Sequence, residues 1–196
     1  MVLHGFIRGQ AYQNLFIKRE NGKLIVAQVY VDDIIFESTK DELAHDFSKL
    51  MQVEFEMSMI GELNYFLGLL IRQQESGIFI SQSKYAENLV RKFGLDSASP
   101  VKTPMSPNVK LTVDLLGKSV DSSLYRSMIG SLLYLNASRP DISYSVGVCA
   151  GYQANPKEFH MIALKRIIKY VKSTTDFGVW YSKDTNDVLV GYSDAD

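Results

Sequence analysis

Two adjacent carboxylates, Asp32 and Asp33, stand between two strongly apolar stretches, residues 24–31 and 34–36. Val, Ile and Phe favour strands and Asp favours turns, so this pattern predicts a strand–turn–strand. Neighbouring like charges repel one another unless a cation lies between them. Mg²⁺ typically binds through one or two carboxylates together with substrate phosphates. A hairpin that directs both carboxylates to one point therefore predicts a site for Mg²⁺.

An ordinary surface turn is the alternative interpretation of this pair. Asp residues hydrogen-bond to their own backbone and tolerate left-handed conformations, so Asp-Asp is common in turns. Tight hairpins, however, prefer Asn-Gly or Asp-Gly, and neither Asp32 nor Asp33 is followed by Gly. Because the flanks are apolar on both sides, the context favours a metal-binding hairpin over a solvated loop.

The remainder of the chain divides into a β-rich first part and a helical second part, separated by a Pro- and Ser-containing stretch. Asn21-Gly22 predicts a tight turn between two strands. Leu43, Phe47, Leu50 and Met51 have the spacing of one helix face. Together these signals predict strands over 15–18, 24–31, 34–37, 64–72, 78–81, 177–182 and 188–193, and helices over 40–55, 83–93, 123–138, 141–153 and 156–173.

The composition of the chain predicts the kind of cellular compartment in which it lies. No run of 18 apolar residues is present, so no membrane-spanning helix is expected. The N-terminus lacks a signal-peptide layout. A single cysteine, Cys149, excludes an internal disulfide and fits a reducing compartment. We therefore expect an intracellular protein, cytoplasmic or nuclear, with neither a membrane nor a disulfide partner.

Charge is distributed unevenly along the chain. Residues 1–80 have a net charge of −4, residues 81–183 of +7 and residues 184–196 of −4. Within the basic part, Lys165, Lys169 and Lys172 recur at helical spacing with Arg166 beside them. This ridge predicts contact with a nucleic-acid backbone, the main source of sequence-independent affinity. A solvated helix face is the alternative.

The acid hairpin Tyr30-Val31-Asp32-Asp33 resembles the catalytic hairpin of reverse transcriptases. Further motifs follow in order over nearly the whole chain. In that order they resemble the copia-type (pseudovirus) reverse transcriptases of LTR retrotransposons, which are parts of a pol polyprotein, and related stand-alone plant reading frames. The motifs are 55–58, 61–68, 77–82, 84–85, 103–104, 125–126, 129–135, 139–142, 165–166, 170–174 and 192–196.

This resemblance implies an α+β fold, a partial palm with an antiparallel sheet followed by helices and the start of a further domain. Residues 1–95 would be the C-terminal part of the palm, with the acid hairpin and a primer-grip-like hairpin. Residues 96–122 would form a linker and 123–175 a helical thumb or connection-like region. Residues 176–196 would be the truncated start of a ribonuclease H domain.

The resemblance also implies roles for individual residues. Asp32 and Asp33 would be catalytic and bind the metal. Phe66, Leu67 and Gly68 would form the primer-grip-like hairpin, with core packing at a β-bulge as the alternative for the first two. Asp194 would be the first metal ligand of an incomplete ribonuclease H site.

The function implied is RNA-directed DNA synthesis with Mg²⁺ on an RNA template and a DNA primer. A third carboxylate and the fingers lie upstream in the family, and Glu37 replaces a common Gly, so we expect the chain to be inactive alone. An exposed palm edge would favour self-association. The alternatives are a non-catalytic nucleic-acid-binding module and a functionless transposon relic.

Overall fold

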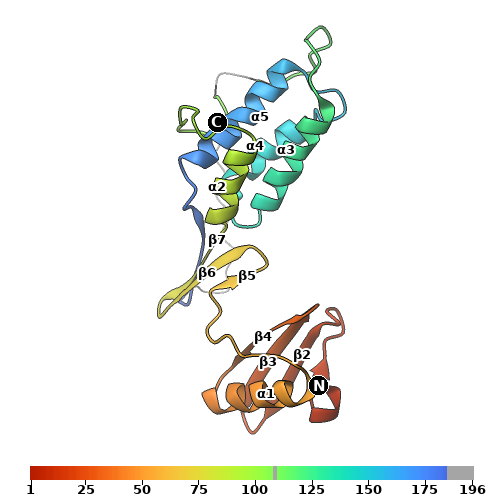
Figure 1. Ribbon diagram of the computed structural model, residues 1–196, viewed down its shortest axis with the longest axis vertical. Coiled ribbons are helices and arrows are strands. Elements are labelled where there is room, and N and C mark those ends of the chain that lie inside the picture. The colour runs from red at the N-terminus through yellow and green to blue at the C-terminus, as the bar shows by residue number, and fades with distance from the viewer. Residues whose placement is uncertain (108–109, 185–196) are drawn as a thin grey trace. The chain divides into compact units, whose positions relative to one another are not determined.

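The computed structural model describes residues 1–107 and 110–184. In these residues the chain has two four-stranded antiparallel sheets and five α-helices, which confirms the mixed α and β composition (Figure 1). The chain forms two compact units, Met1–Leu63 and Asn64–Asp196. The sequence placed its main boundary later, within 96–122, because the Pro and Ser residues there resemble a linker.

The N-terminal unit is one sheet with one helix. Its strands follow the order of the chain: β1 (Ile7–Arg8), β2 (Leu15–Glu20), β3 (Lys23–Tyr30) and β4 (Asp33–Ser38). A short 3₁₀ helix, η1 (Val2–His4), precedes them, and α1 (Asp41–Glu54) follows. The predicted turn is confirmed, because Asn21 and Gly22 both have positive φ, 51° and 74°, as a two-residue hairpin loop requires.

Helix α1 covers part of one face of this sheet. Phe47 and Met51, predicted from their spacing to share a face, are both buried. The ring of Phe47 lies edge-on to Phe36 of β4, with 4.8 Å between centroids. Five buried apolar residues make up this core: Phe6, Ile25, Ala27, Phe47 and Met51.

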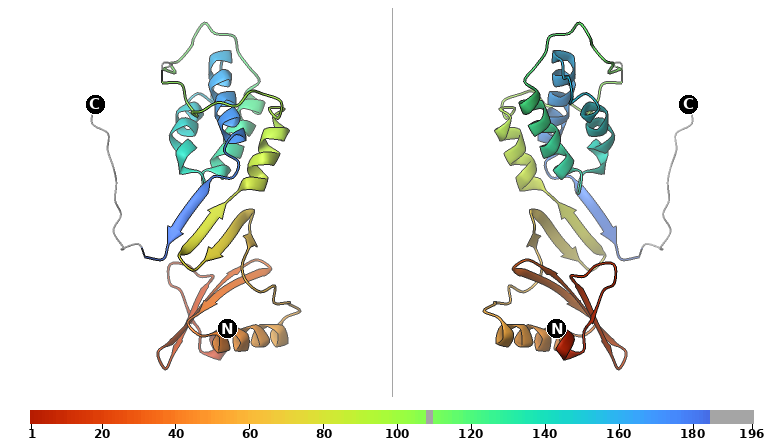
Figure 2. Two further views of the ribbon diagram at one scale, coloured as in Figure 1. Left: turned by 90° about the vertical axis from the view of Figure 1, so that its left-hand side faces the viewer. Right: turned by 90° about the vertical axis from the view of Figure 1, so that its right-hand side faces the viewer.

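The C-terminal unit combines a second sheet with four helices (Figures 1 and 2). Its strands are β5 (Tyr65–Phe66), β6 (Leu69–Gln74), β7 (Gly77–Ser81) and β8 (Gly178–Ser182), paired in that order. The helices are α2 (Ser83–Lys92), α3 (Ser122–Leu135), α4 (Pro140–Ala150) and α5 (Glu158–Lys172). Sixteen buried apolar residues, all from these four helices, form one core.

Two features of this unit differ from the sequence prediction. The single strand expected over 64–72 is a hairpin, because Leu67 and Gly68 turn the chain with φ values of 49° and 84°. Strand β8, which the resemblance assigns to the start of a further domain, pairs with β7 in the second sheet. The other strand predicted near the C-terminus, 188–193, lies outside the described residues.

Residues 96–107 and 110–122 are not extended away from the fold. They form a strap across α5 and the loop before it. Arg166 donates to the carbonyl and hydroxyl oxygens of Thr103, at 3.2 and 2.9 Å. Lys172 donates to the carbonyl oxygen of Ala98 at 2.7 Å. Buried His160 accepts from its own helix N-terminus at Nδ1, so Nε2 carries the proton and donates to the carbonyl oxygen of Thr112 at 2.9 Å.

Candidate functional site

The acid pair forms the tip of the β3–β4 hairpin. Tyr30 pairs with Asp33, so Val31 and Asp32 are the two turn residues. Val31 has a φ of 50° and is 82% exposed. Positive φ is a genuine outlier for a β-branched residue, and such strain persists only where the surrounding structure imposes it, often at functional sites. The hairpin therefore holds its tip in a conformation that Val alone does not favour.

Both carboxylates are exposed to solvent. Successive strand residues point to opposite faces of a sheet, so Asp33 lies on the face opposite Ile34, away from α1. In residues 1–107 and 110–184, neither Asp32 nor Asp33 has a cationic partner, and no three His, Cys, Asp or Glu side chains come together as a metal site. The described residues thus place two adjacent carboxylates at the hairpin tip and no third candidate metal ligand beside them.

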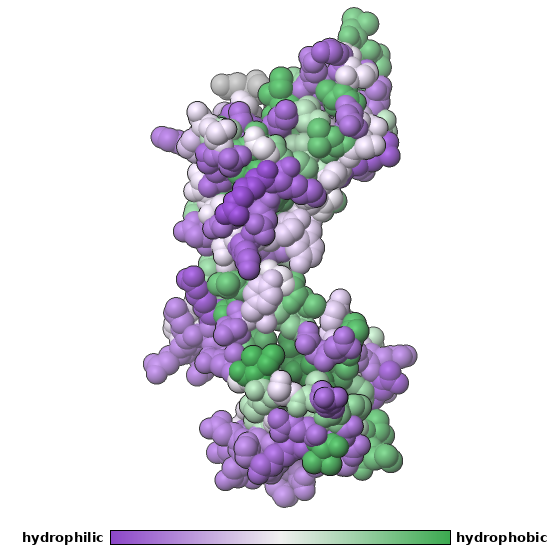
Figure 3. Space-filling model, in the orientation of Figure 1, coloured by the Kyte–Doolittle hydropathy of each residue, from purple (hydrophilic) through white to green (hydrophobic). Residues whose placement is uncertain are grey.

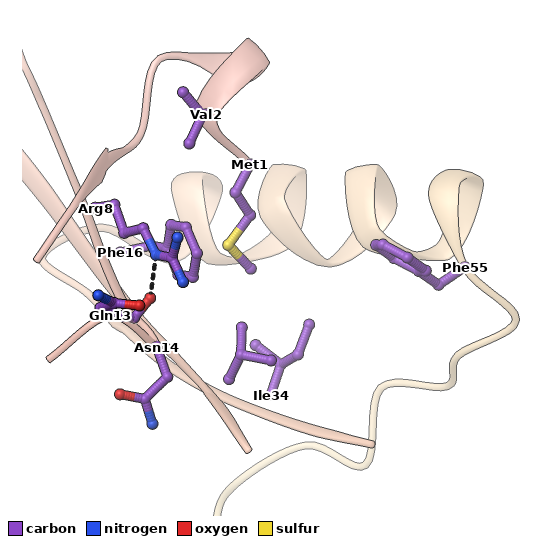
Figure 4. A pocket seen from close by; sticks show the side chains of 9 residues that line it. Met1, Val2, Arg8, Gln13, Asn14, Phe16, Ile34 and Phe55 are labelled. Atoms are coloured by element: carbon purple, nitrogen blue, oxygen red, sulfur yellow. Dashed lines mark hydrogen bonds between the residues drawn. The ribbon is translucent and has the colours of Figure 1, made fainter. Parts of the chain in front are cut away.

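A groove of about 650 Å³ lies on the other face of the same hairpin (Figure 4). Val29 and Ile34, which pair next to the acidic turn, line it together with Phe16 and Phe55. Arg8 lies at one side and donates to the carbonyl oxygen of Gln13. The groove is lined mostly by apolar side chains, so this part of the sheet beside the acid pair has apolar surface that α1 does not cover.

The predicted primer-grip-like residues form a second tight hairpin, in the C-terminal unit. Phe66 pairs with Leu69, and Leu67 and Gly68 form the turn. The hydroxyl of Tyr134, on α3, donates to the carbonyl oxygen of Leu67 at 2.8 Å. A Cβ on Gly68 would lie 2.6 Å from that hydroxyl oxygen, so only Gly fits the close approach. This hairpin is therefore fixed against α3.

Tyr134 is itself supported by Tyr85 of α2. The two rings meet edge to face, with 4.8 Å between centroids. Tyr85 donates to the carbonyl oxygen of Ser131 at 3.0 Å, and burial raises the pKa of Tyr85. Tyr134 lies in the motif 129–135, which contributes to the family resemblance, but the sequence did not predict its contact with Leu67. The two residues are 67 positions apart in the chain, and no local pattern indicates that they meet.

The four basic residues of α5 divide into two pairs. Arg166 and Lys172 bind the strap, as described above. Lys165 is exposed and Lys169 is partly exposed, and neither has a polar partner within the described part of the chain. Ile162, on the same helix, is also exposed, at 69%. Of these four basic residues, Lys165 and Lys169 are the two without a polar partner in the described part of the chain.

A buried charge network joins the start of α4 to the end of α5, and nothing in the sequence indicated it beyond the motif 139–142. Arg139 is 1% exposed and forms a bidentate pair with Asp141, at 2.8 and 2.7 Å. It also donates to the carbonyl and hydroxyl oxygens of Thr174, at 2.8 and 2.7 Å. The network holds the turn that leads from α5 into β8.

Asp141 receives a further hydrogen bond, from the hydroxyl of Tyr170 at 2.9 Å. Burial alone would raise the pKa of Asp141. The hydrogen bonds and charge of Arg139, with the Tyr170 hydroxyl, outweigh it and lower that pKa below its ordinary 3.8. Asp194, the predicted ribonuclease H ligand, lies outside the described residues.

Comparison with known proteins identifies the family of the chain. Residues 1–107 match the family model described as reverse transcriptase (RNA-dependent DNA polymerase). The chain belongs to the reverse transcriptase family. The match includes both predicted site hairpins, residues 30–33 and 66–68.

Several curated relatives are transposon proteins. The chain is 35% identical over 192 residues to the retrovirus-related Pol polyprotein from transposon RE1 of Arabidopsis thaliana, covering 98% of this chain. It is 29% identical over 212 residues to the corresponding polyprotein from transposon TNT 1-94 of Nicotiana tabacum, covering all of this chain. It spans only 13% and 16% of those relatives. These matches place it among copia-type Pol polyproteins.

A shorter relative matches over most of its own length. An uncharacterized mitochondrial protein of Arabidopsis thaliana is 33% identical over 168 residues, which cover 86% of this chain and 70% of that protein. No solved structure matches this reverse transcriptase family chain significantly. Within the described residues, none of the helices combines the length and apolarity needed to span a bilayer.

Proposed function

We propose that this chain supplies the carboxylate hairpin of an RNA-directed DNA polymerase, and that it does not polymerise alone. The observation that supports the proposal is the strained, exposed turn at Val31, which presents Asp32 and Asp33 at the tip of a paired strand hairpin. Two carboxylates with solvent access are the ligand set that Mg²⁺ uses together with substrate phosphates.

Asp32 and Asp33 would hold Mg²⁺ at the hairpin tip. When bound, the metal stabilises the attacking and leaving oxygens of an in-line displacement at a phosphate. The described residues bring no third acidic side chain to this pair. Because a metal site with too few ligands does not hold its ion in productive geometry, we expect the isolated chain to bind metal weakly and to lack polymerase activity.

Mn²⁺ tests the hairpin directly, because its paramagnetism broadens the NMR signals of nearby nuclei. Millimolar Mn²⁺ should broaden the backbone amides of residues 30–35 before others in the chain. Asp32→Asn with Asp33→Asn should abolish this selectivity. Asp41→Asn with Glu42→Gln is the matched control, since it removes an exposed acidic pair elsewhere in the same unit. Broadening that is no stronger at 30–35 than at 41–42 would contradict the proposed metal site.

Primer extension tests the second half of the proposal. Purified chain with poly(rA)·oligo(dT), dTTP and Mg²⁺ should give no steady incorporation. Incorporation that disappears in Asp32→Asn would show instead that the two carboxylates suffice.

The free lysines of α5 would contact the nucleic-acid backbone in the same enzyme. Lys165→Glu with Lys169→Glu should weaken binding to an RNA–DNA hybrid. The slope of log affinity against log salt should fall by about 0.9 for each phosphate that is no longer neutralised. Lys84→Glu, an exposed lysine of α2, is the control. Unchanged binding in the double variant would leave these residues as an ordinary solvated surface.

A further inference from the structure

The second sheet contributes no side chain to the buried core of the C-terminal unit. That core is made wholly of residues from the helices α2 to α5. Its strands β6, β7 and β8 run side by side (Figure 2). In the ladder, Arg72 pairs with Phe79, and Phe79 pairs with Trp180. Directly paired residues share a face, so this row presents a guanidinium and two aromatic rings on one side of the sheet.

Two glycines lie beneath these rings. A Cβ on Gly77 would lie 2.7 Å from Cζ2 of Trp180, and a Cβ on Gly178 would lie 2.8 Å from Cζ of Phe79. Each ring therefore reaches diagonally toward a glycine of the neighbouring strand, where the missing side chain leaves room for it.

The exposure and the charge of this face of the sheet both suit the binding of a ligand. Trp180 is 43% exposed and Tyr65, which shares the face, is 57% exposed. Arg72 is exposed and has no acidic partner among the described residues. The described part of this face carries no acidic side chain; Gln74 is exposed, whereas Ser81 is buried. Figure 3 shows one face of the molecule, on which hydrophilic (purple) and hydrophobic (green) side chains are intermixed.

We propose that this aromatic face, formed by Tyr65, Arg72, Phe79 and Trp180, binds single-stranded nucleic acid by stacking unpaired bases on its rings. Aromatic side chains on an open sheet stack bases regardless of sequence, because every base has a π-face. Arg72 contacts the strand's phosphates and makes binding salt-dependent. The site deepens the proposed function by giving an unpaired strand a binding surface, and it requires neither Asp32 nor Asp33.

A purely structural role is the competing explanation. Rings placed over glycines also shield the backbone and stabilise strand pairing. The two explanations differ in one respect: only the proposed site requires a free base. The test must therefore vary the ligand's bases as well as the protein's rings.

Trp180 reports on its own site, since it is the only tryptophan in the chain. The full chain is titrated at low salt with (dT)₁₂, with a 12-nucleotide strand of abasic residues and with a 12-base-pair duplex. We expect (dT)₁₂ to quench Trp180 fluorescence and to protect it from acrylamide. The abasic strand and the duplex should quench it much less.

Variants then assign the effect to the face, with affinity measured by the anisotropy of labelled (dT)₁₂. Trp180→Ala should weaken binding by about tenfold, within the range for loss of one base–aromatic stack, and Trp180→Phe should retain most of the affinity. Arg72→Ala should reduce the salt slope by about 0.7, the value for one phosphate of a single strand. The matched control is Tyr181→Ala, which removes a 56% exposed ring from the opposite face of the same strand.

Three results would overturn the proposal: absence of quenching by (dT)₁₂, equal quenching by the abasic strand, or equal loss of affinity in Tyr181→Ala. If Trp180→Ala fails to fold, Trp180→Phe, Arg72→Ala and the ligand series still decide. Metal binding at residues 30–35 is measured separately, so failure of this site leaves the proposed metal site standing.

Discussion

The two units of this chain differ in how completely they bury their apolar surface. The N-terminal unit has five buried apolar residues around a single helix, and part of its sheet lines an open groove. The C-terminal unit buries sixteen apolar residues among four helices. Regions with few buried contacts open more readily than a packed core. The acid hairpin is therefore carried by the less buried unit, and the C-terminal unit has the larger core.

Phe47→Ala should produce the largest effect and should separate the two units. Phe47 is 4% exposed and packs against Phe6 and Phe36. Replacing a buried Phe by Ala typically costs about 3–5 kcal/mol, which is a large share of what a core of this size can provide. Amide signals of residues 15–38 should collapse to unfolded positions, while those of α3 to α5 remain.

Val53→Ala is the control for that variant, since Val53 lies on the same helix and is 84% exposed. Loss of the helical signals together with those of the sheet would show that the units fold as one.

Asp141→Asn tests the charge network in the C-terminal unit. It leaves the buried guanidinium of Arg139 without its anionic partner. Removing one member of a buried ion pair lowers the free energy of unfolding by about 3–5 kcal/mol. The Asp141 side chain is 33% exposed, so solvent screens part of this interaction and we expect a loss of about 2 kcal/mol. The urea midpoint of the helical signals should fall, and that of residues 15–38 should not change.

The same variant should alter the pH dependence of stability. The folded-state pKa of Asp141 lies below its ordinary 3.8, so its stabilisation is present above that value and is lost as pH falls through the lowered pKa. Wild type and Asp141→Asn should therefore differ at pH 7 and converge as pH falls below about 4. A difference that persists undiminished at low pH would exclude the carboxylate as its source.

Tyr134→Phe should produce a smaller, local effect. It removes the hydroxyl that holds the carbonyl of Leu67, and a single hydrogen bond contributes about 1 kcal/mol. Hydrogen exchange should accelerate at residues 66–69 and remain unchanged in α4. Tyr144→Phe, which alters a 76% exposed tyrosine, should have no effect. Equal acceleration in both variants would contradict the assigned contact.

Sequence reasoning succeeded where local chemistry determines structure. The Asn21-Gly22 turn, the hairpin at Asp32 and the buried face of α1 all follow from spacing and turn preference. It failed where distant partners decide the outcome. Leu67 adopts a turn conformation that its residue type disfavours, and its anchor, Tyr134, lies 67 residues away.

The contacts of the strap also could not be predicted from the sequence. Residues 98–112 have the composition of a linker, yet their carbonyl groups accept hydrogen bonds from Lys172, Arg166 and His160 of α5. Backbone carbonyls carry no sequence signal, so composition could not reveal this binding. For the candidate site, the sequence predicted the hairpin that carries Asp32 and Asp33, but the positive φ of Val31 could be seen only in the structure.

Hydrogen exchange measured over the whole wild-type chain, in a verified monomer, tests most directly whether the units differ in stability. Amides of β2, β3 and β4 should exchange much faster than those of the buried stretches of α3 and α5, with the slowest sites at residues 128–132 and 164–168. Protection across residues 15–38 equal to that of α5 would contradict the account, because the acid hairpin would then belong to a unit as stable as the helical core.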